Sequence, residues 1–249
     1  MSLSDLAGLF LVIISTILLI GLYLLKDRVK ASFRAIPSFT KFIQSIGTAV
    51  EQGTRVHFSL GSADVTRERT AASFVGLSAL RQISELAAAS DKPPVATSGD
   101  AALSVLSQDN LQSAYDAAGM TEQYRPDTGR VTGLTPFSYA AGTLPMMTDE
   151  DFSSSLLVGS YGVEIGLLTE AIERQDAFTL SAADSLPAQA LVYASAQEPL
   201  IGEELFATGA YLKTGRAHMV SLYVQDILRW LIIVLLLGGT AMKILAGLV

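Results

Sequence analysis

The chain has 249 residues, of which 50% are hydrophobic and only 16% are charged, whereas soluble domains have about 25% charged residues. Its positive mean hydropathy of +0.41 likewise points to membrane segments. It contains no cysteine, which excludes disulfides, thiolate metal sites and a cysteine nucleophile. The net charge of −7 hides an acidic middle, since residues 42–212 carry eight Lys/Arg and 21 Asp/Glu, and this charge argues against a nucleic-acid partner.

Residues 5–25 are predicted to form a first transmembrane helix. The uncharged apolar run within it, residues 6–25, is about 30 Å long as a helix, which matches the hydrocarbon core of a bilayer. A cleaved signal peptide is the alternative, but its positive residues would precede the apolar run, whereas Lys26 and Arg28 follow it. Residues 26–50 are predicted to be a basic amphipathic neck. This neck either lies on the membrane surface or packs as a linker helix on the domain or a neighbouring subunit.

Residues 51–212 are predicted to form a cytosolic α/β domain, because short apolar runs alternate with helical patterns. The predicted strands are 55–60, 95–97, 131–134, 152–158, 177–181 and 190–194. The predicted helices are 66–89, 101–118, 136–141, 163–174 and 203–213. The expected fold class is α/β with a mainly parallel, Rossmann-like sheet, flanked by two transmembrane helices.

Small polar residues follow three of the predicted strands, where open α/β sheets bind ligands against the exposed N–H groups of helix N-termini. The candidate ligand-binding residues are Gly61, Ser62, Asp64, Ser98, Gly99, Asp100, Gly159 and Ser160. If the three turns cluster, they would form an anion or nucleotide pocket. None of them is a G-x-G-x-x-G or a G-x-x-x-x-G-K-[ST] motif, and Ser and Asp are also ordinary helix caps. Capping and ligand binding therefore both stay open.

No catalytic residues are predicted. His57 lies within a strand and His218 in a basic linker, and neither has a partner at metal-ligand spacing. The acidic triplet 149–151 is interpreted as a solvated turn in preference to a cation site. A G-x-S-x-G nucleophile elbow is absent from the sequence. The sequence thus favours a protein without enzymatic activity, cofactor or metal.

The chain is predicted to end with a basic linker helix, residues 213–226, and a second transmembrane helix, residues 227–249. Arg229 and Trp230 stand where an interfacial anchor belongs, as Lys26 and Arg28 do after the first span. Lys243 is placed to snorkel toward the opposite headgroups, and the alternative is a cation that faces a helix bundle or pore. Because Lys/Arg-rich flanks stay cytoplasmic, we expect a two-pass protein of the inner (plasma) membrane with its middle domain in the cytoplasm.

Two stretches, VHFSLGSADVTRERTAASFVGLSALRQISELAAASDKPPVATSGD and LLVGSYGVEIGLLTEAIER, carry a resemblance. They resemble a family of uncharacterised prokaryotic membrane proteins with a Rossmann-like α/β domain between terminal transmembrane helices. The resemblance implies an architecture and no activity. The leading hypothesis is a membrane-anchored scaffold that forms a homo-oligomer through its cytosolic α/β domain. Two alternatives stay open: a membrane-tethered nucleotide- or anion-binding domain, with possible enzymatic activity, and a pore or transporter subunit.

Overall fold

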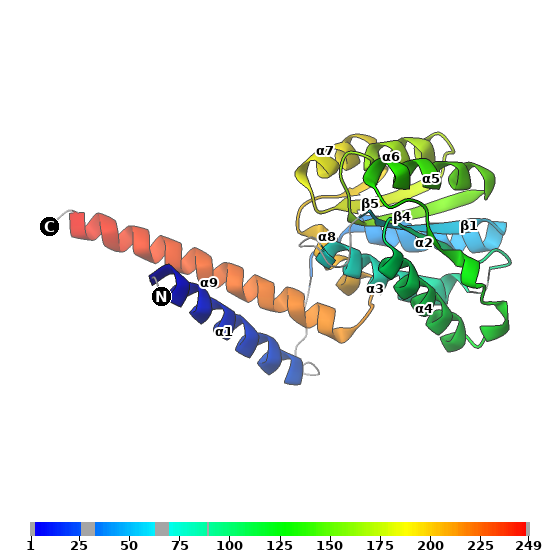
Figure 1. Ribbon diagram of the computed structural model, residues 1–249. Helices are drawn as coiled ribbons and strands as arrows, with labels where there is room; N and C mark the ends of the chain where they lie inside the picture. Colours follow the sequence, from blue (N-terminus) through cyan, green and yellow to red (C-terminus); the bar gives the residue numbers. More distant parts are fainter. Residues whose placement is uncertain (1–2, 26–32, 63–69, 89, 248–249) are drawn as a thin grey trace. The chain divides into compact units, whose positions relative to one another are not determined.

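The computed structural model describes residues 3–25, 33–62, 70–88 and 90–247. The chain divides into two compact units, and the first combines residues 1–34 with residues 215–249. Within this unit, helix α1 (Leu3–Leu24) packs against helix α9 (Arg216–Gly247), as Figure 1 shows. The second unit, residues 35–214, contains the sheet and all the other helices of the described residues.

Helix α9 is long and apolar enough to cross a membrane. The most apolar window within its stretch Ala217–Ile244 has a mean hydropathy of 1.9, and only 11% of that window is buried. Among the described residues, the apolar part of α1, Gly8–Leu24, is shorter than a full span. One candidate span is therefore present at the C-terminal end, and the predicted span at residues 5–25 stays a prediction. The predicted linker 213–226 and the second predicted span share one continuous helix from Arg216.

The second unit is built on a six-stranded sheet in which every pair of neighbouring strands is parallel, with the order β3-β2-β1-β4-β5-β6. The strands are β1 (Arg55–Gly61), β2 (Val95–Ser98), β3 (Gly129–Val131), β4 (Phe152–Ser160), β5 (Phe178–Ala183) and β6 (Glu198–Leu200). Nearly all residues of β1, β2 and β4 are buried, as expected for parallel strands covered on both faces. The predicted α/β class with a parallel sheet is confirmed.

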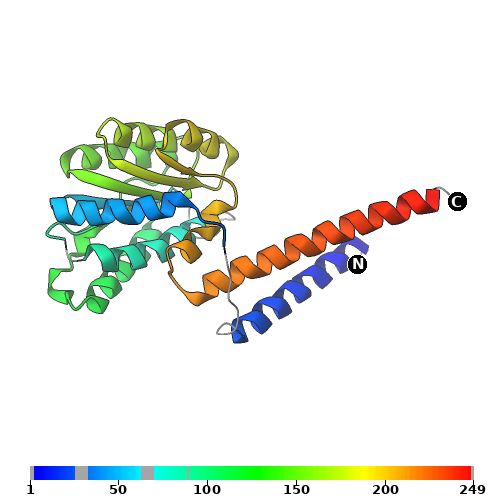
Figure 2. The same ribbon diagram turned by 180° about the vertical axis from the view of Figure 1, so that it is seen from behind.

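Helices cover both faces of this sheet, which makes three layers (Figures 1 and 2). One face is covered by α2 (Pro37–Gln52), α3 (Thr70–Ala87), α4 (Ala101–Ala117) and α8 (Glu204–Tyr211). The other is covered by α5 (Pro136–Asp149), α6 (Ile165–Glu173) and α7 (Leu186–Ser195). Alternation along β1 sends Val56, Phe58 and Leu60 into the first core, while His57 and Ser59 point to the second layer.

The prediction of a strand at residues 190–194 is wrong, because these residues belong to helix α7. The Ser185 side chain accepts a hydrogen bond from Ala188 N and caps the helix, and a proline follows in its first turn. Ala188 and Val192, four residues apart, are both buried against the sheet. The sixth strand is instead Glu198–Leu200, which pairs with β5.

Helix α2 packs on the α/β unit. It is amphipathic, as predicted for the neck, and buries Phe39, Phe42, Ile46 and Ala49 in the core. The Phe39 ring stacks on Tyr211 of α8, with 5.0 Å between ring centroids. Of the two interpretations of the neck, the structure therefore agrees with a linker helix on the domain for this part of it.

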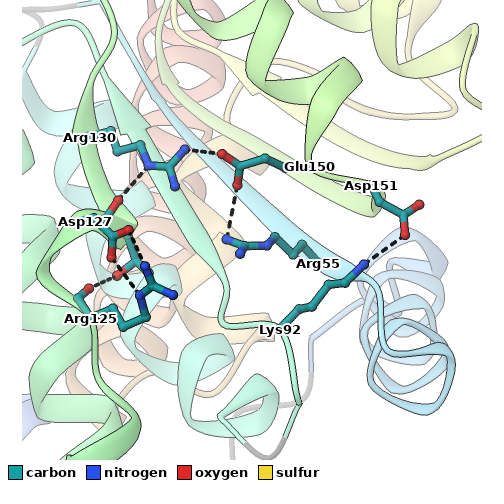
Figure 3. A network of polar contacts seen from close by, with 8 residues as sticks. Arg55, Lys92, Arg125, Asp127, Arg130, Glu150 and Asp151 are labelled. Atoms are coloured by element: carbon teal, nitrogen blue, oxygen red, sulfur yellow. Dashed lines mark hydrogen bonds and ion pairs between the residues drawn. The ribbon is translucent and has the colours of Figure 1, made fainter.

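Polar side chains connect the amino ends of the strands (Figure 3). Glu150 bridges two arginines: its carboxylate pairs with Arg130 of β3 and lies 3.1 Å from the guanidinium of Arg55 in β1. The neighbouring Asp151 pairs with Lys92 at 3.0 Å, but at the exposed surface. The acidic triplet is thus more than a solvated turn, because Glu150 neutralises two cations that are less than one-third exposed.

Replacing Glu150 by Gln is expected to lower the unfolding free energy by about 1–2 kcal/mol, because two partly buried guanidinium groups lose their shared counter-charge. Asp151→Asn is the matched control, since it breaks an exposed pair and asparagine tolerates the backbone φ of 57° found there. Its expected change is within about 0.5 kcal/mol. Urea unfolding of the full-length protein, followed by circular dichroism, measures both. Equal losses in the two variants would contradict the bridging role.

Candidate functional site

The three polar turns predicted as a ligand site come together at the carboxyl edge of the sheet. They follow β1, β2 and β4, which are neighbours, and the strand order reverses between β1 and β4. Gly99 N donates a hydrogen bond to Gly61 O at 2.9 Å, and Ser62 N donates to Ser160 O at 3.0 Å. The described candidates thus form one contiguous group, in which only Ser62 and Asp100 are partly exposed, and Asp64 lies outside the described residues.

The glycines of these turns allow backbone to approach backbone. Gly61 has φ +86°, and a Cβ on it would lie 2.3 Å from Ser160 O. A Cβ on Gly159 would lie 2.1 Å from Leu60 O. Both distances are far below van der Waals contact, so each position needs glycine for the packing of β1 against β4. The requirement for these glycines is explained without a bound ligand.

The polar side chains of the turns bond mainly to the chain itself. Asp100 Oδ1 accepts from Leu103 N at 2.9 Å and caps α4. Ser98 Oγ donates to the Asp100 carbonyl at 3.0 Å, and Ser160 Oγ donates to Asp184 Oδ2 at 2.9 Å. Of the two interpretations of Ser and Asp at these positions, helix capping therefore accounts for Asp100.

Two carboxylates at this edge were not predicted from the sequence. Glu164 is buried, and its Oε1 accepts from Ser62 Oγ and from Gly162 N, both at 2.9 Å. Asp184 accepts from Ser160 Oγ and, at 3.4 Å, from Tyr161 N. Asp184 directly follows β5, so the rule that ligands bind beyond strand carboxyl ends would have selected it. Glu164 has no such signal, because it lies within the first residues of a helical pattern.

These carboxylates define what the edge can do chemically. They take up hydroxyl and N–H donors that would otherwise face an anion, and they add negative charge beside the turns. A phosphate would be repelled by this charge, whereas a cation or a hydrogen-bond donor such as a sugar hydroxyl would be attracted.

A chain of buried hydrogen bonds runs beneath the turns, on the sheet face covered by α5 and α6. His57 Nε2 lies 2.9 Å from Thr97 Oγ1, which lies 3.0 Å from the hydroxyl of Tyr139. The Tyr139 hydroxyl also bonds Ser59 Oγ, which accepts from the Tyr161 hydroxyl at 2.7 Å. The chain therefore connects the middle of β1 to the turn after β4.

Burial keeps the groups of this chain uncharged. Burial, assisted by the positive charge of Arg130, lowers the pKa of His57 to about 3. Burial likewise raises the pKa of Tyr139 and that of Tyr161. A neutral histidine with so low a pKa is a poor general base near pH 7. We therefore interpret the chain as a structural network that satisfies buried hydroxyls.

Two shallow hollows lie at the opposite, amino edge of the sheet, with volumes of about 340 and 290 Å³. Both are lined by Asp176 and Gln197, and neither includes any of the predicted site residues. Within the described ranges, no group of three or more His, Cys, Asp or Glu could hold a metal ion.

The predicted membrane anchors are only partly described. Lys26 and Arg28 lie outside the described residues. Arg229, Trp230 and Lys243 all lie on α9, where the Trp230 side chain is 67% exposed and Lys243 is exposed. Trp230 and Lys243 are about 20 Å apart along the helix axis at 1.5 Å per residue. This spacing is compatible with anchors near opposite interfaces, which stays a prediction.

Comparison with curated proteins found no match, and neither did comparison with solved structures. One family model, described as a domain of unknown function (DUF6754), matches residues 4–249 and hence nearly the whole chain. This match agrees with the expectation of an uncharacterised family. The chain therefore belongs to the family of the domain of unknown function DUF6754.

Proposed function

We propose that the protein is a membrane-anchored scaffold whose α/β unit, residues 35–214, associates with further copies into a homo-oligomer. The observation that carries this proposal is an apolar outer surface on α7, where Leu186 is 80% and Tyr193 is 73% exposed. Helices at a protein surface normally present polar residues to water. Exposed apolar surface of this kind commonly marks a protein interaction site.

The helices of the first unit support the membrane part of the proposal. Side chains such as Phe10 and Leu24 of α1 and Leu235 of α9 are more than half exposed, which suits a lipid environment. In a two-pass arrangement α1 and α9 would cross the bilayer together, and the basic residues Lys213 and Arg229 would keep the α/β unit in the cytoplasm. Anchoring every copy in one membrane raises their effective concentration and favours lateral assembly.

The oligomeric state of the full-length protein tests the proposal directly. Mass measurements in mild detergent and in lipid nanodiscs, over a range of protein concentrations, are expected to give a dimer or a larger closed assembly. A monomer at every concentration in both environments would overturn the scaffold hypothesis.

A second candidate function, ligand binding at the carboxyl edge, is favoured by one observation. The order β3-β2-β1-β4-β5-β6 is the order of doubly wound dinucleotide-binding sheets, which hold their ligand where the order reverses. The three polar turns meet there, although Glu164 and Asp184 disfavour a phosphate. A thermal-shift screen of nucleotides and sugars tests this candidate. Binding that is lost on Ser62→Ala would support it, and the absence of any hit would count against it.

A further inference from the structure

We propose that copies of the chain meet through the outer side of α7, related by a two-fold axis that passes near Ala190. We call this surface the α7 face and define it as Leu186, Ala190 and Tyr193. The inference rests on the proposed homo-oligomer, because it names the surface through which that assembly forms.

The α7 face follows from the spacing of its residues. Leu186, Ala190 and Tyr193 are four and three residues apart, so they project from one side of the helix. Ala188 and Val192 project from the other side into the core. The face is therefore a regular apolar stripe with an alanine at its centre, where two helices can approach closely.

Helix α7 is held firmly beside α6. Thr169 Oγ1 of α6 lies 2.6 Å from Ser195 Oγ of α7. Gly166 of α6 faces Leu191 of α7, so closely that an added Cβ would lie 3.3 Å from the leucine side chain. Leu167, the residue after Gly166, is itself 43% exposed. A surface fixed on two packed helices loses little conformational entropy when it binds.

The charge distribution indicates a second copy as the occupant. No residue of Leu186–Ser195 is charged, whereas residues 42–212 as a whole carry a net charge of −13. Two such acidic domains repel each other except where an uncharged surface meets an uncharged surface. Helix α7 has no carboxylate that could pair with a basic partner and no cation that could pair with an anionic lipid surface. An identical α7 face matches this absence of charge.

Pairing of the edge strand β6 with a strand of another copy is disfavoured. The edge strand β6 has three residues, and Pro199 stands at its centre without an N–H group. Short edge strands with proline resist pairing with another chain. Copies that meet on this side of the unit therefore meet through helices.

Cysteine cross-linking tests the two-fold contact, and the chain offers a background free of cysteine. Ala190→Cys, treated with a short bismaleimide in the native membrane, is expected to give a covalent dimer, because the two thiols face each other across the axis. Ala117→Cys, at an exposed site on α4 in the opposite helix layer, is the matched control and is expected to stay uncross-linked.

A charge placed on the α7 face gives an independent test. Tyr193→Glu is expected to weaken self-association on the order of tenfold or more, because the added carboxylate would be buried without a counter-charge against apolar side chains of the other copy. Val105→Glu changes a similarly exposed apolar residue on α4 and is expected to leave self-association unchanged. Circular dichroism checks that both variants fold.

The outcomes separate this inference from the proposed function. If the wild-type protein is a monomer throughout, the scaffold hypothesis itself is wrong. If the wild type assembles but Ala190→Cys does not cross-link, or Tyr193→Glu still assembles with wild-type affinity, then the assembly uses another surface and the α7 face is wrong. Equal weakening by Tyr193→Glu and Val105→Glu would also contradict it.

Discussion

Acidification below pH 6.5 is expected to destabilise the α/β unit through His57, by about 1.4 kcal/mol of unfolding free energy for each pH unit. The side chain is fully buried, and its only hydrogen bond in the described structure joins Nε2 to Thr97. Its ring lies near Phe152, with 5.3 Å between ring centroids. Nothing in these surroundings solvates a positive charge, and Arg130 opposes one.

The sign of the effect follows from the two pKa values. Burial holds the pKa of folded His57 at about 3, below the ordinary value of 6.5 that applies in the unfolded chain. Between these values the unfolded state binds a proton that the folded state does not. The stability contribution is therefore complete above pH 6.5 and is lost progressively as the pH falls toward 3.

Comparison with a His57→Gln variant isolates this effect from the titration of carboxylates. The unfolding free energy of each full-length protein would be measured at several pH values between about 7 and 4.5. The unfolding free energy of the wild type is expected to fall more steeply with decreasing pH than that of the variant, by about 1.4 kcal/mol per pH unit, the value for one bound proton. A loss of stability in the variant that is the same at every pH does not change this slope. His218→Gln is the control, because the second histidine lies in α9, outside the α/β unit. Identical slopes for the wild type and His57→Gln would show that burial does not suppress the histidine charge.

The parallel sheet could be predicted because fully buried strands are continuous apolar runs bounded by turn residues, as in β1 and β4. The prediction failed at residues 190–194, where a short apolar run fits a strand and a buried helix side equally well. The signals that decide for a helix are the Ser185 cap and the proline after it. These are local and were available in the sequence.

The candidate site was predictable only in part. Turns after β1, β2 and β4 could be placed, but their meeting depends on strand order, which a single sequence does not reveal. Glu164 was missed because its partner Ser62 is 102 residues away. The buried chain from His57 to Tyr161 likewise joins residues from three separate elements and one turn. Such networks arise from tertiary packing and leave no local pattern.

Substituting Gly76 by Ala is expected to cost about 3 kcal/mol of unfolding free energy, because α3 crosses the sheet there with no room for a side chain. A Cβ on Gly76 would lie 2.3 Å from Val158 O and 2.9 Å from Leu60 Cδ2. The leucine side chain can move, but the carbonyl belongs to the central strand β4. Helix α3 would have to shift away from β4 and weaken the core that it shares with β1.

Gly47→Ala is the matched control, since it makes the same change inside helix α2 at a site with no atom within 4 Å. There the added methyl group meets nothing, and alanine favours the helix over glycine by about 0.5–1 kcal/mol. The two variants are therefore expected to shift the urea midpoint of the full-length protein in opposite directions. Parallel shifts of equal size would mean that helix propensity alone governs both glycines, and the close approach of α3 to β4 would then not constrain the fold.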